Sequence, residues 1–516
     1  MHNPIIFADY PDPDIIRVED TYYMVSTTMH FMPGCVILRS YDLVHWETAV
    51  HVYRTLDDTP GQKLEEGGHI YGKGMWAASL RYHKGNFYVC FVANDTGKTY
   101  LYTAASIGGP WSKQTIEGFY HDCSLLFDDD GRVYLVAGNM EIRLIELKDD
   151  LSGPKPGGLN RIIVRDKREE VYLGYEGAHL YKINGKYAVF FIHMSKEAGR
   201  RTQACFVADS LDGEFTGGDV FNDDMGFFNS GVAQGGIVDT PEGDWYAMLF
   251  QDYGALGRIP VLVPFRWEND RPVFPEQAPL QIDVPSTRPG YVYKPLFGSD
   301  DFHYHSDENG RVCLKDYWEW NHNPADGLWS VTEKPEVYRI RTDRLSPNLI
   351  FAVNTLTQRS IGPRSEAMVT LDGSGLKEGD YAGLCLLIST YGFIALTREE
   401  GQLYLVMKAR PTEDKSIFGK LVDSESGVEY ARVAVGGSQV RLKVRCNFVN
   451  KADECEFYYL DGDSWNKLGV SHNMVFKMDM FVGARIGLFM FSTREWGGTA
   501  DFSSFEYTRI EACAGG

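Results

Sequence analysis

The sequence has no long hydrophobic run and no excess of basic residues. None of its apolar stretches approaches the ~18 uninterrupted apolar residues of a membrane-spanning helix, so we expect no membrane partner. The chain carries 51 Lys and Arg residues against 71 Asp and Glu residues, a net charge of −20. This charge argues against nucleic acid or an anionic membrane surface as a partner, and it is compatible with a neutral substrate such as a sugar.

Cysteine is sparse and shows no metal-ligand spacing. The nine cysteines extend from Cys35 to Cys513, and several lie inside strand-like runs such as Tyr88-Val-Cys-Phe-Val. This distribution predicts free buried thiols in a reducing compartment. The amino terminus also lacks an apolar signal segment, so we expect a cytoplasmic protein.

The residues that are abundant favour β-structure. Hydrophobic residues make up 44% of the chain, aromatic residues make up 13%, and there are 53 glycines. Aromatic side chains suit strands and glycines suit the turns between them, which favours an all-β protein. A chain of 516 residues is too long for one core, so two or three domains are expected.

A turn that leads into an aromatic-rich strand occurs five times in the first half of the chain. The turns lie at Asp20, Gly85, Gly131, Gly185 and Gly243. The steps of 65, 46, 54 and 58 residues are close to the blade period of a β-propeller with loop insertions. Apolar runs after the turns suit sheets that are packed on both faces. We therefore predict a five-bladed β-propeller, with five unrelated β-hairpins as the alternative.

One residue with functional potential precedes each turn at a nearly constant distance. The offset is eight residues in the first unit and nine in the other four. The five marker residues are Asp12, Trp76, Asp122, Glu176 and Gln234. Because the first strand of a propeller blade lies nearest the axis, this shared register would place all five at one rim of the central channel. Unrelated hairpins would not explain the constant offset.

The second half of the chain shows a different pattern. Proline and glycine punctuate residues 285–295, as expected of a linker. Beyond them come short strand-like runs such as Ala367-Met-Val-Thr-Leu and Ile486-Gly-Leu-Phe-Met-Phe, which predict a β-sandwich. We therefore expect a catalytic propeller over residues 1–290 and a sandwich over residues 291–516. No compact ligand motif in the second half indicates a metal site.

Three of the five markers are carboxylates, which points to hydrolysis of a glycosidic bond. That reaction needs one protonated acid for the leaving oxygen and one carboxylate that acts as base or nucleophile. A third carboxylate nearby would raise the pKa of the acid. Each residue also has a structural interpretation, since Asp12 between prolines could be a turn former, Asp122 could cap a strand and Trp76 could belong to the core. The shared register favours the functional interpretation.

Several segments together resemble one enzyme family. They are Tyr10-Pro-Asp-Pro-Asp, Ser40-Tyr-Asp-Leu-Val-His-Trp, Met75-Trp-Ala, Asp122-Cys-Ser-Leu, Glu176-Gly-Ala-His-Leu-Tyr-Lys and Gly235-Gly-Ile-Val-Asp-Thr. These segments resemble glycoside hydrolase family 43 and cover nearly the whole predicted propeller. The second half, including Asn354-Thr-Leu-Thr-Gln-Arg, resembles the concanavalin-like sandwich of the β-xylosidase branch. The resemblance implies a five-bladed propeller that hydrolyses with inversion.

The resemblance also implies roles for individual residues. It makes Asp12 the general base, Glu176 the general acid, and Asp122 the residue that modulates the pKa of the acid and orients it. Arg258 falls where family members place an arginine that binds sugar hydroxyls. In members that carry the sandwich, a loop of that domain closes one side of the site and makes it a pocket.

The remaining implied contacts are aromatic or unusual. Trp76 and Phe31 fall where aromatic walls of the innermost subsite are expected. Gln234 stands where many members have a histidine at the axial channel, in some of them near a bound calcium ion. No cofactor is expected to be required, and the weaker ligand at Gln234 leaves an axial calcium ion open. Met32 stands where an aromatic residue is frequent.

The expected function is an exo-acting, inverting glycosidase that releases single pentoses from short oligosaccharides derived from xylan. We favour β-D-xylosidase activity, with α-L-arabinofuranosidase as the alternative, because the two sugars present similar hydroxyl patterns. A retaining fructosidase, an endo-acting arabinanase and a catalytically silent carbohydrate-binding propeller are rivals. A small oligosaccharide is the expected partner, and self-association into a homo-oligomer stays open.

Overall fold

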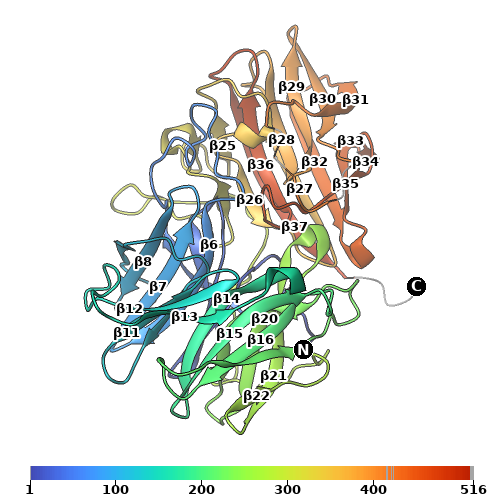
Figure 1. Ribbon diagram of the computed structural model, residues 1–516. Helices are drawn as coiled ribbons and strands as arrows, with labels where there is room; N and C mark the ends of the chain where they lie inside the picture. Colours follow the sequence, from blue (N-terminus) through green and yellow to red (C-terminus); the bar gives the residue numbers. More distant parts are fainter. Residues whose placement is uncertain (1, 414–415, 420, 422, 512–516) are drawn as a thin grey trace.

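The computed structural model describes residues 2–413, 416–419, 421 and 423–511 of the chain. These residues form strands and five short 3₁₀ helices arranged as two bodies (Figure 1). The amino-terminal half builds the propeller and the carboxy-terminal half builds the sandwich. The 3₁₀ helices are η1 (Arg168–Glu170), η2 (Gly254–Leu256), η3 (Asp326–Leu328), η4 (Leu349–Phe351) and η5 (Val449–Lys451).

The propeller has five antiparallel blades. In four of them the first strand either contains the marker residue or begins just after it. Blade 1 is β1 (Asp14–Val18), β2 (Thr21–Ser26), β4 (Gly34–Ser40) and β5 (Glu47–Tyr53). Blade 2 is β6 (Met75–His83), β7 (Asn86–Ala93), β8 (Lys98–Ala104) and β9 (Ser112–Ile116). Blade 3 is β10 (Ser124–Phe127), β11 (Val133–Ala137), β12 (Glu141–Leu147) and β13 (Asn160–Arg165).

The last two blades follow the same order with one interruption. Blade 4 is β14 (Val171–Ile183), β15 (Lys186–Ser195), β16 (Thr202–Ala208) and β17 (Thr216–Phe221). Blade 5 contains β20 (Trp245–Asp252), β21 (Arg258–Glu268) and β22 (Arg271–Val273). Its first strand is split into β18 (Val232–Ala233) and β19 (Ile237–Asp239), which both pair with β20. The five-bladed propeller predicted from the repeat is therefore confirmed.

The predicted turns all lie between the first and second strands of their blades. The first strands pack around the axis, since β1 contacts β6 and β19, and β10 contacts β6 and β14. Second strands such as β15 are apolar and buried along most of their length because neighbouring blades cover both of their faces. The five markers therefore lie within the innermost strands or within two residues of them. Their common position at one rim of the channel stays a prediction.

A buried ion pair joins the blades at the axis. Asp14 of β1 accepts hydrogen bonds from the Arg81 guanidinium at 2.6 Å and from the Leu80 backbone nitrogen at 2.8 Å. Arg81 donates onward to the Leu125 carbonyl at 2.8 Å and to Ser124 Oγ at 2.8 Å, both in blade 3. Burial alone would raise the pKa of Asp14, but Arg81 and a neighbouring histidine outweigh it and lower the pKa to about 2.

The sandwich consists of two antiparallel sheets of eight strands each. The first sheet is β3 (Phe31–Met32), β23 (Glu319–Asn321), β26 (Leu356–Arg359), β36 (Arg485–Ser492), β28 (Asp380–Leu387), β29 (Gly392–Glu399), β30 (Gln402–Ala409) and β31 (Val428–Ala434). The second sheet is β24 (Trp329–Ser330), β25 (Tyr338–Arg341), β37 (Thr499–Ile510), β27 (Arg364–Asp372), β32 (Gln439–Asn447), β33 (Glu454–Asp461), β34 (Ser464–Lys467) and β35 (His472–Asn473). Strict alternation of burial along β27 shows that one face of this sheet points into the core. The predicted sandwich is confirmed.

The two domains are joined more closely than the sequence indicates. Strand β3 belongs to the blade 1 segment of the chain, yet it pairs with β23 at the edge of the first sandwich sheet. At this interface Glu319 is fully buried and binds Arg359 at 2.8 Å, His51 at 3.1 Å and the guanidinium of Arg485. Arg359 and Arg485 belong to the same sheet as Glu319, and His51 belongs to blade 1, so the His51 contact ties this buried cluster to the propeller.

The cysteines are unpaired in the described part of the chain. Eight are free thiols, and all of these except Cys313 are buried, which confirms that thiols rather than disulfides occupy these positions. Cys513 lies outside the described residues. Among the described residues, no helix has the length and apolar character needed to cross a membrane.

We predict that Arg81→Met destabilises the propeller strongly, because it leaves the Asp14 carboxylate buried without its cation. The expected loss is about 3–5 kcal/mol, which corresponds to a fall in the thermal midpoint of roughly 10 °C. Arg132→Met is the matched control, since the Arg132 side chain is 52% exposed and its ion pair lies on the surface. An Arg81→Met variant that unfolds at the temperature of the control would contradict the role of the pair.

Candidate active site

The markers stand where the innermost strands begin or bend. Asp12, Asp122 and Gln234 have positive φ angles of 53°, 49° and 56°, and Glu176 precedes Gly177, whose φ is 63°. Trp76 lies at a break in the register between β6 and β7. Non-glycine residues in the left-handed region are uncommon and cluster at functional sites, where the altered backbone re-aims a side chain. The shared offset in the sequence therefore reflects a shared irregularity in the strands.

Asp12 is held by one cation and one hydroxyl. Both of its carboxylate oxygens lie within hydrogen-bonding distance of Arg258 Nη1, at 2.8 and 3.0 Å, and Thr27 Oγ1 donates to one of them at 2.8 Å. The side chains of Asp12 and Arg258 are only 8% and 3% exposed. Arg258, which was expected to touch a sugar, therefore also orients the carboxylate expected to act as base.

Asp9 connects this pair to the second domain. Its carboxylate accepts hydrogen bonds from the backbone nitrogens of Arg258 and Gly483, each at 2.8 Å. Residue 257 is a glycine with a φ of 102°, and a Cβ atom there would lie 2.3 Å from Asp9 Oδ1. Sequence reasoning missed Asp9, although it lies directly before the Tyr10-Pro-Asp-Pro-Asp motif. Its role depends on a partner in the sandwich that no local pattern reveals.

Asp122 and Glu176 come together from blades 3 and 4. The Gly177 backbone nitrogen donates to Asp122 Oδ2 at 3.1 Å, and the Asn139 side-chain amide donates to Glu176. His121 lies between the two carboxylates, with its Nε2 atom 3.6 Å from an oxygen of each. The structure thus brings together two of the three predicted catalytic residues, with a histidine that was not predicted to take part.

Charges within this group shift their pKa values in opposite senses. Burial raises the pKa of Asp122, and the negative charges of Glu176 and Asp12 add to this effect while His121 opposes it. Burial would lower the pKa of His121, but Asp122 and Glu176 outweigh it and raise the pKa to about 9. His121 is therefore an imidazolium cation at neutral pH. Its position directly before Asp122 was the one feature of the sequence that could have identified it.

Two features of the site bear on metal binding. His121, Asp122 and Glu176 place three donor atoms within 4.8 Å of one another, and no other group among the described residues brings three such donors together. At the propeller axis, by contrast, the Arg81 guanidinium lies against Asp14. An axial calcium ion near Gln234 stays an open prediction.

Gln234 supports the strand that carries Glu176. Its backbone nitrogen donates to Gln203 Oε1 at 2.7 Å, and its residue is 5% exposed. Its side chain packs so closely on Gly177 that a Cβ atom at that glycine would lie 2.7 Å from Gln234 Cδ. Gln234 therefore shapes the backbone directly after Glu176, and its predicted contact with a sugar stays a prediction.

The two predicted aromatic walls differ in their surroundings. Trp76 is partly buried, and its ring lies 5.7 Å from that of His121 and 5.4 Å from that of Phe481 in the sandwich. Phe31 is fully buried, with the Arg485 guanidinium 3.5 Å above its ring. Trp76 therefore lies beside the carboxylates, whereas Phe31 lies in the domain interface and offers no surface to a sugar in this structure.

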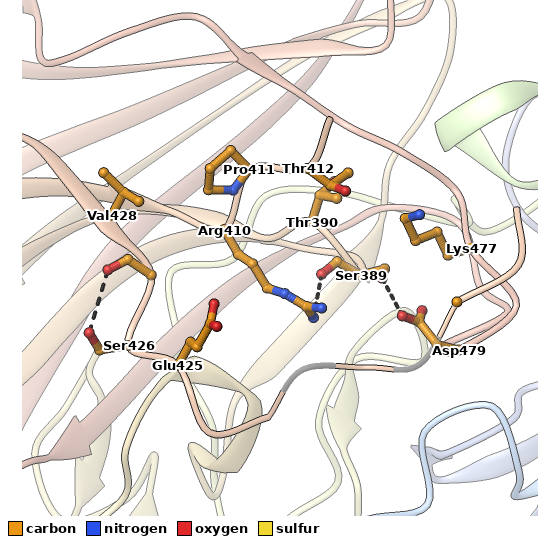
Figure 2. Close-up of a pocket in the computed structure, with 12 residues that line it drawn as sticks. Ser389, Thr390, Arg410, Pro411, Thr412, Glu425, Ser426, Val428, Lys477 and Asp479 are labelled. Carbon is orange, nitrogen blue, oxygen red and sulfur yellow. Dashed lines mark hydrogen bonds between the residues drawn. The ribbon is translucent and has the colours of Figure 1, made fainter. Parts of the chain in front are cut away.

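A loop of the sandwich closes the site, as expected from the family. Phe481 packs under Arg258, whose guanidinium carbon lies 4.2 Å from the ring centre, and its carbonyl accepts a hydrogen bond from Arg258 at 3.3 Å. Figure 2 shows how this loop is anchored at its other side, in a polar cavity of about 590 Å³. There Ser389 donates to Asp479 at 2.8 Å, and Arg410 donates to the Ser389 carbonyl at 3.1 Å.

A five-bladed propeller that presents clustered carboxylates beside an aromatic ring and an arginine is the architecture of a glycoside hydrolase. The family model for glycosyl hydrolases family 43 matches residues 1–272. The model for the β-xylosidase C-terminal concanavalin A-like domain matches residues 307–508. The chain belongs to glycosyl hydrolases family 43 and is a glycoside hydrolase.

Individual relatives agree with this assignment. A β-xylosidase from Formosa agariphila is 27% identical over 98% of this chain and 90% of its own length. A putative β-xylosidase from Xylanibacter ruminicola is 31% identical over 72% of this chain and 69% of its own. Among solved structures, a bifunctional GH43-CE protein from Bacteroides eggerthii is 41% identical with a TM-score of 0.89. The match covers 99% of this chain but only 64% of that longer chain.

We predict that His121→Gln weakens the fold in a pH-dependent way. The folded-state pKa of about 9 exceeds the ordinary value of 6.5, so this histidine stabilises the fold fully below pH 6.5 and loses that effect as pH rises through 9. The difference in thermal midpoint between the parent protein and the variant should therefore be large near pH 6 and vanish near pH 10. The corresponding difference in the free energy of unfolding at pH 6 is on the order of 2–3 kcal/mol. His83→Gln is the control, because burial lowers the pKa of His83. Equal gaps at both pH values would contradict the prediction.

Proposed function

We propose that this glycoside hydrolase is an exo-acting, inverting enzyme that releases single pentoses from the non-reducing end of oligosaccharides derived from xylan. Its main activity is β-D-xylosidase. The observation that carries the proposal is the placement of Asp12, Asp122 and Glu176 in or directly before the innermost strands of three blades, beside a wall that the sandwich supplies through Phe481. A wall on one side favours a pocket over an open groove, and a pocket admits only a chain end.

The reaction assigns one role to each carboxylate. Glu176 donates its proton to the glycosidic oxygen as the bond from that oxygen to the anomeric carbon breaks. Asp12 accepts a proton from a water molecule whose oxygen bonds to the opposite face of the anomeric carbon, so the configuration inverts. Asp122 lies next to Glu176 and binds the Gly177 nitrogen, so it orients the acid and sets the local charge.

The neighbouring residues bind and orient the sugar. Arg258 holds Asp12 through Nη1 and donates to the Phe481 carbonyl through Nη2. Its buried Nε has no hydrogen-bond partner in the part of the chain that the structure describes, so Nε is the donor that we assign to a sugar hydroxyl. The indole nitrogen of Trp76 is buried and has no hydrogen-bond partner among the described residues. An unpaired buried donor is costly, and a substrate hydroxyl would satisfy it. Trp76 thus offers both an apolar ring face and a donor.

α-L-Arabinofuranosidase activity is the second candidate. A relative from Bacteroides ovatus, 28% identical over 66% of this chain, is named a non-reducing end α-L-arabinofuranosidase. A family 43 enzyme whose active site was engineered, described as displaying both endo-xylanase and exo-arabinofuranosidase activity, is 26% identical over 99% of this chain, with a TM-score of 0.87. Against a silent binding propeller stands the complete set of three carboxylates with their supporting hydrogen bonds.

The proposed reaction needs no metal ion. The Arg81 guanidinium, held by Asp14 at the axis, supplies a permanent positive charge in the propeller centre. His121, as an imidazolium cation, supplies a second positive charge beside Asp122 and Glu176. Asp14 already neutralises Arg81, so the charges that balance the three carboxylates are those of His121 and of Arg258 beside Asp12.

We predict that Glu176→Gln and Asp12→Asn impair hydrolysis differently. Loss of the general acid should lower kcat about 10²–10⁴-fold on xylobiose but far less on a dinitrophenyl xyloside, whose leaving group needs no proton. Loss of the general base should slow both substrates by a similar factor, because water must be activated in either case. Steady-state kinetics on the two substrates provide the measurement. Unchanged hydrolysis of xylobiose by Glu176→Gln, or retention of the anomeric configuration by NMR, would sink the mechanism.

We predict that aryl β-D-xylopyranoside is the best substrate in a panel that also contains aryl arabinofuranoside, arabinopyranoside and galactoside. Addition of a chelator should leave each rate within about twofold, because cationic side chains supply the charge that a metal would bring. Release of the aryl group is followed by absorbance. A higher kcat/KM on arabinofuranoside would reverse the preference, and a rate that falls on chelation and returns with calcium would overturn the metal-free proposal.

A further inference from the structure

A side pocket of about 340 Å³ adjoins the active site. It shares Phe481 with the wall of the site, and it includes Gly257, which directly precedes Arg258. One side is formed by loops of blades 4 and 5, and the other by the sandwich. None of the residues assigned to catalysis lines it, so it is a separate space, and Phe481 is the side chain that it has in common with the site.

The pocket contains apolar side chains that are exposed to solvent. Phe228 from blade 5 is 57% exposed and Met478 from the sandwich is 37% exposed. Phe476 lines the same space. Exposed large apolar side chains that gather beside an active site indicate a binding surface, and an aromatic ring suits the face of a sugar.

The same pocket contains three cationic side chains, of which one is uncommitted. Arg201 is paired with Asp252 at 2.6 Å, and Arg200 lies 3.4 Å from Asp224. Lys451 has its Nζ atom 4.8 Å from the centre of the Phe228 ring. Within the described part of the chain, Lys451 has no carboxylate within ion-pair distance.

The nearby acid Asp453 forms no ion pair with the Lys451 ammonium. Its carboxylate accepts a hydrogen bond from the Ala255 nitrogen at 3.1 Å. Burial raises the pKa of Asp453 to about 6, although Lys451 opposes that shift. The chain has a net charge of −20, so an unpaired lysine beside the active site, here Lys451 above the exposed Phe228 ring, is unusual.

We propose that this pocket binds an acidic sugar branch, a hexuronosyl group attached to the xylosyl unit next to the one released. The branch carboxylate pairs with the Lys451 ammonium, and its ring lies on Phe228. The inference rests on the proposed function, since it concerns the part of the substrate that remains after cleavage. A neutral branch would contact the Phe228 ring but leave Lys451 unpaired. A free anion would pair with Lys451 but would have no need of a pocket that adjoins the active site at Phe481.

The test compares Lys451→Ala and Lys451→Arg with the parent protein. Binding of a xylotriose that carries one glucuronosyl branch on its second unit, and of unbranched xylotriose, is measured by calorimetry on Glu176→Gln backgrounds. Lys451→Ala should weaken binding of the branched ligand roughly 10-fold and leave the unbranched ligand unchanged. Lys451→Arg should retain the preference. Lys467→Ala, which removes the same charge elsewhere in the sandwich, should alter neither ligand.

A second ligand separates charge from shape. The methyl ester of the branched xylotriose should bind parent protein and Lys451→Ala alike, because it lacks the negative charge. The proposal is overturned if Lys451→Ala weakens binding of the branched acid and of its methyl ester equally, or if it leaves the affinity for the branched acid unchanged. Hydrolysis of unbranched xylobiose by the Lys451 variants tests the proposed function separately, so a failure there is distinguishable from a failure of the side pocket.

Discussion

The Asp14–Arg81 ion pair at the propeller axis is the interaction on which the site most depends. A buried charge pair is stable only when its remaining donors and acceptors are satisfied, and here the backbone of blades 2 and 3 supplies the partners. Because Asp14 follows Asp12 by two residues, the pair that joins the blades also fixes the start of the strand that presents Asp12. The geometry of catalysis and the closure of the propeller are thus one constraint.

The sandwich is a structural part of the active site. Asp9 binds the backbone of Arg258 with one oxygen and that of Gly483 with the other, so a single carboxylate sets the distance between propeller and sandwich at the pocket. Glu319 of the sandwich also reaches across the interface, through its hydrogen bond to His51 of blade 1. Since Phe481 lies two residues before Gly483, any shift of the sandwich would move the wall of the site.

The parts of this structure that the sequence predicted are those that depend on local patterns. Turn residues and apolar strands recur within each blade, so the propeller, the sandwich and the marker register could all be read from the chain. Asp9 and Gly483 lie 474 positions apart, and nothing near either residue indicates their contact. The role of His121 depends on the contact between blades 3 and 4. The full burial of Phe31 depends on Arg485, which belongs to the other domain. Contacts between distant segments are therefore what sequence reasoning missed.

Phe481 divides the region between the domains into two spaces with different chemistry. On one side lie Trp76, Arg258 and the carboxylates, where we propose that the sugar is cleaved. On the other side lie Phe228 and Lys451, which touch none of the catalytic groups. Because the walls of the second space come from loops and from the sandwich, substitutions there can change which substituted substrates are accepted without disturbing the charges that perform hydrolysis. The closing loop therefore separates the proposed catalytic residues from the proposed binding surface for a branch.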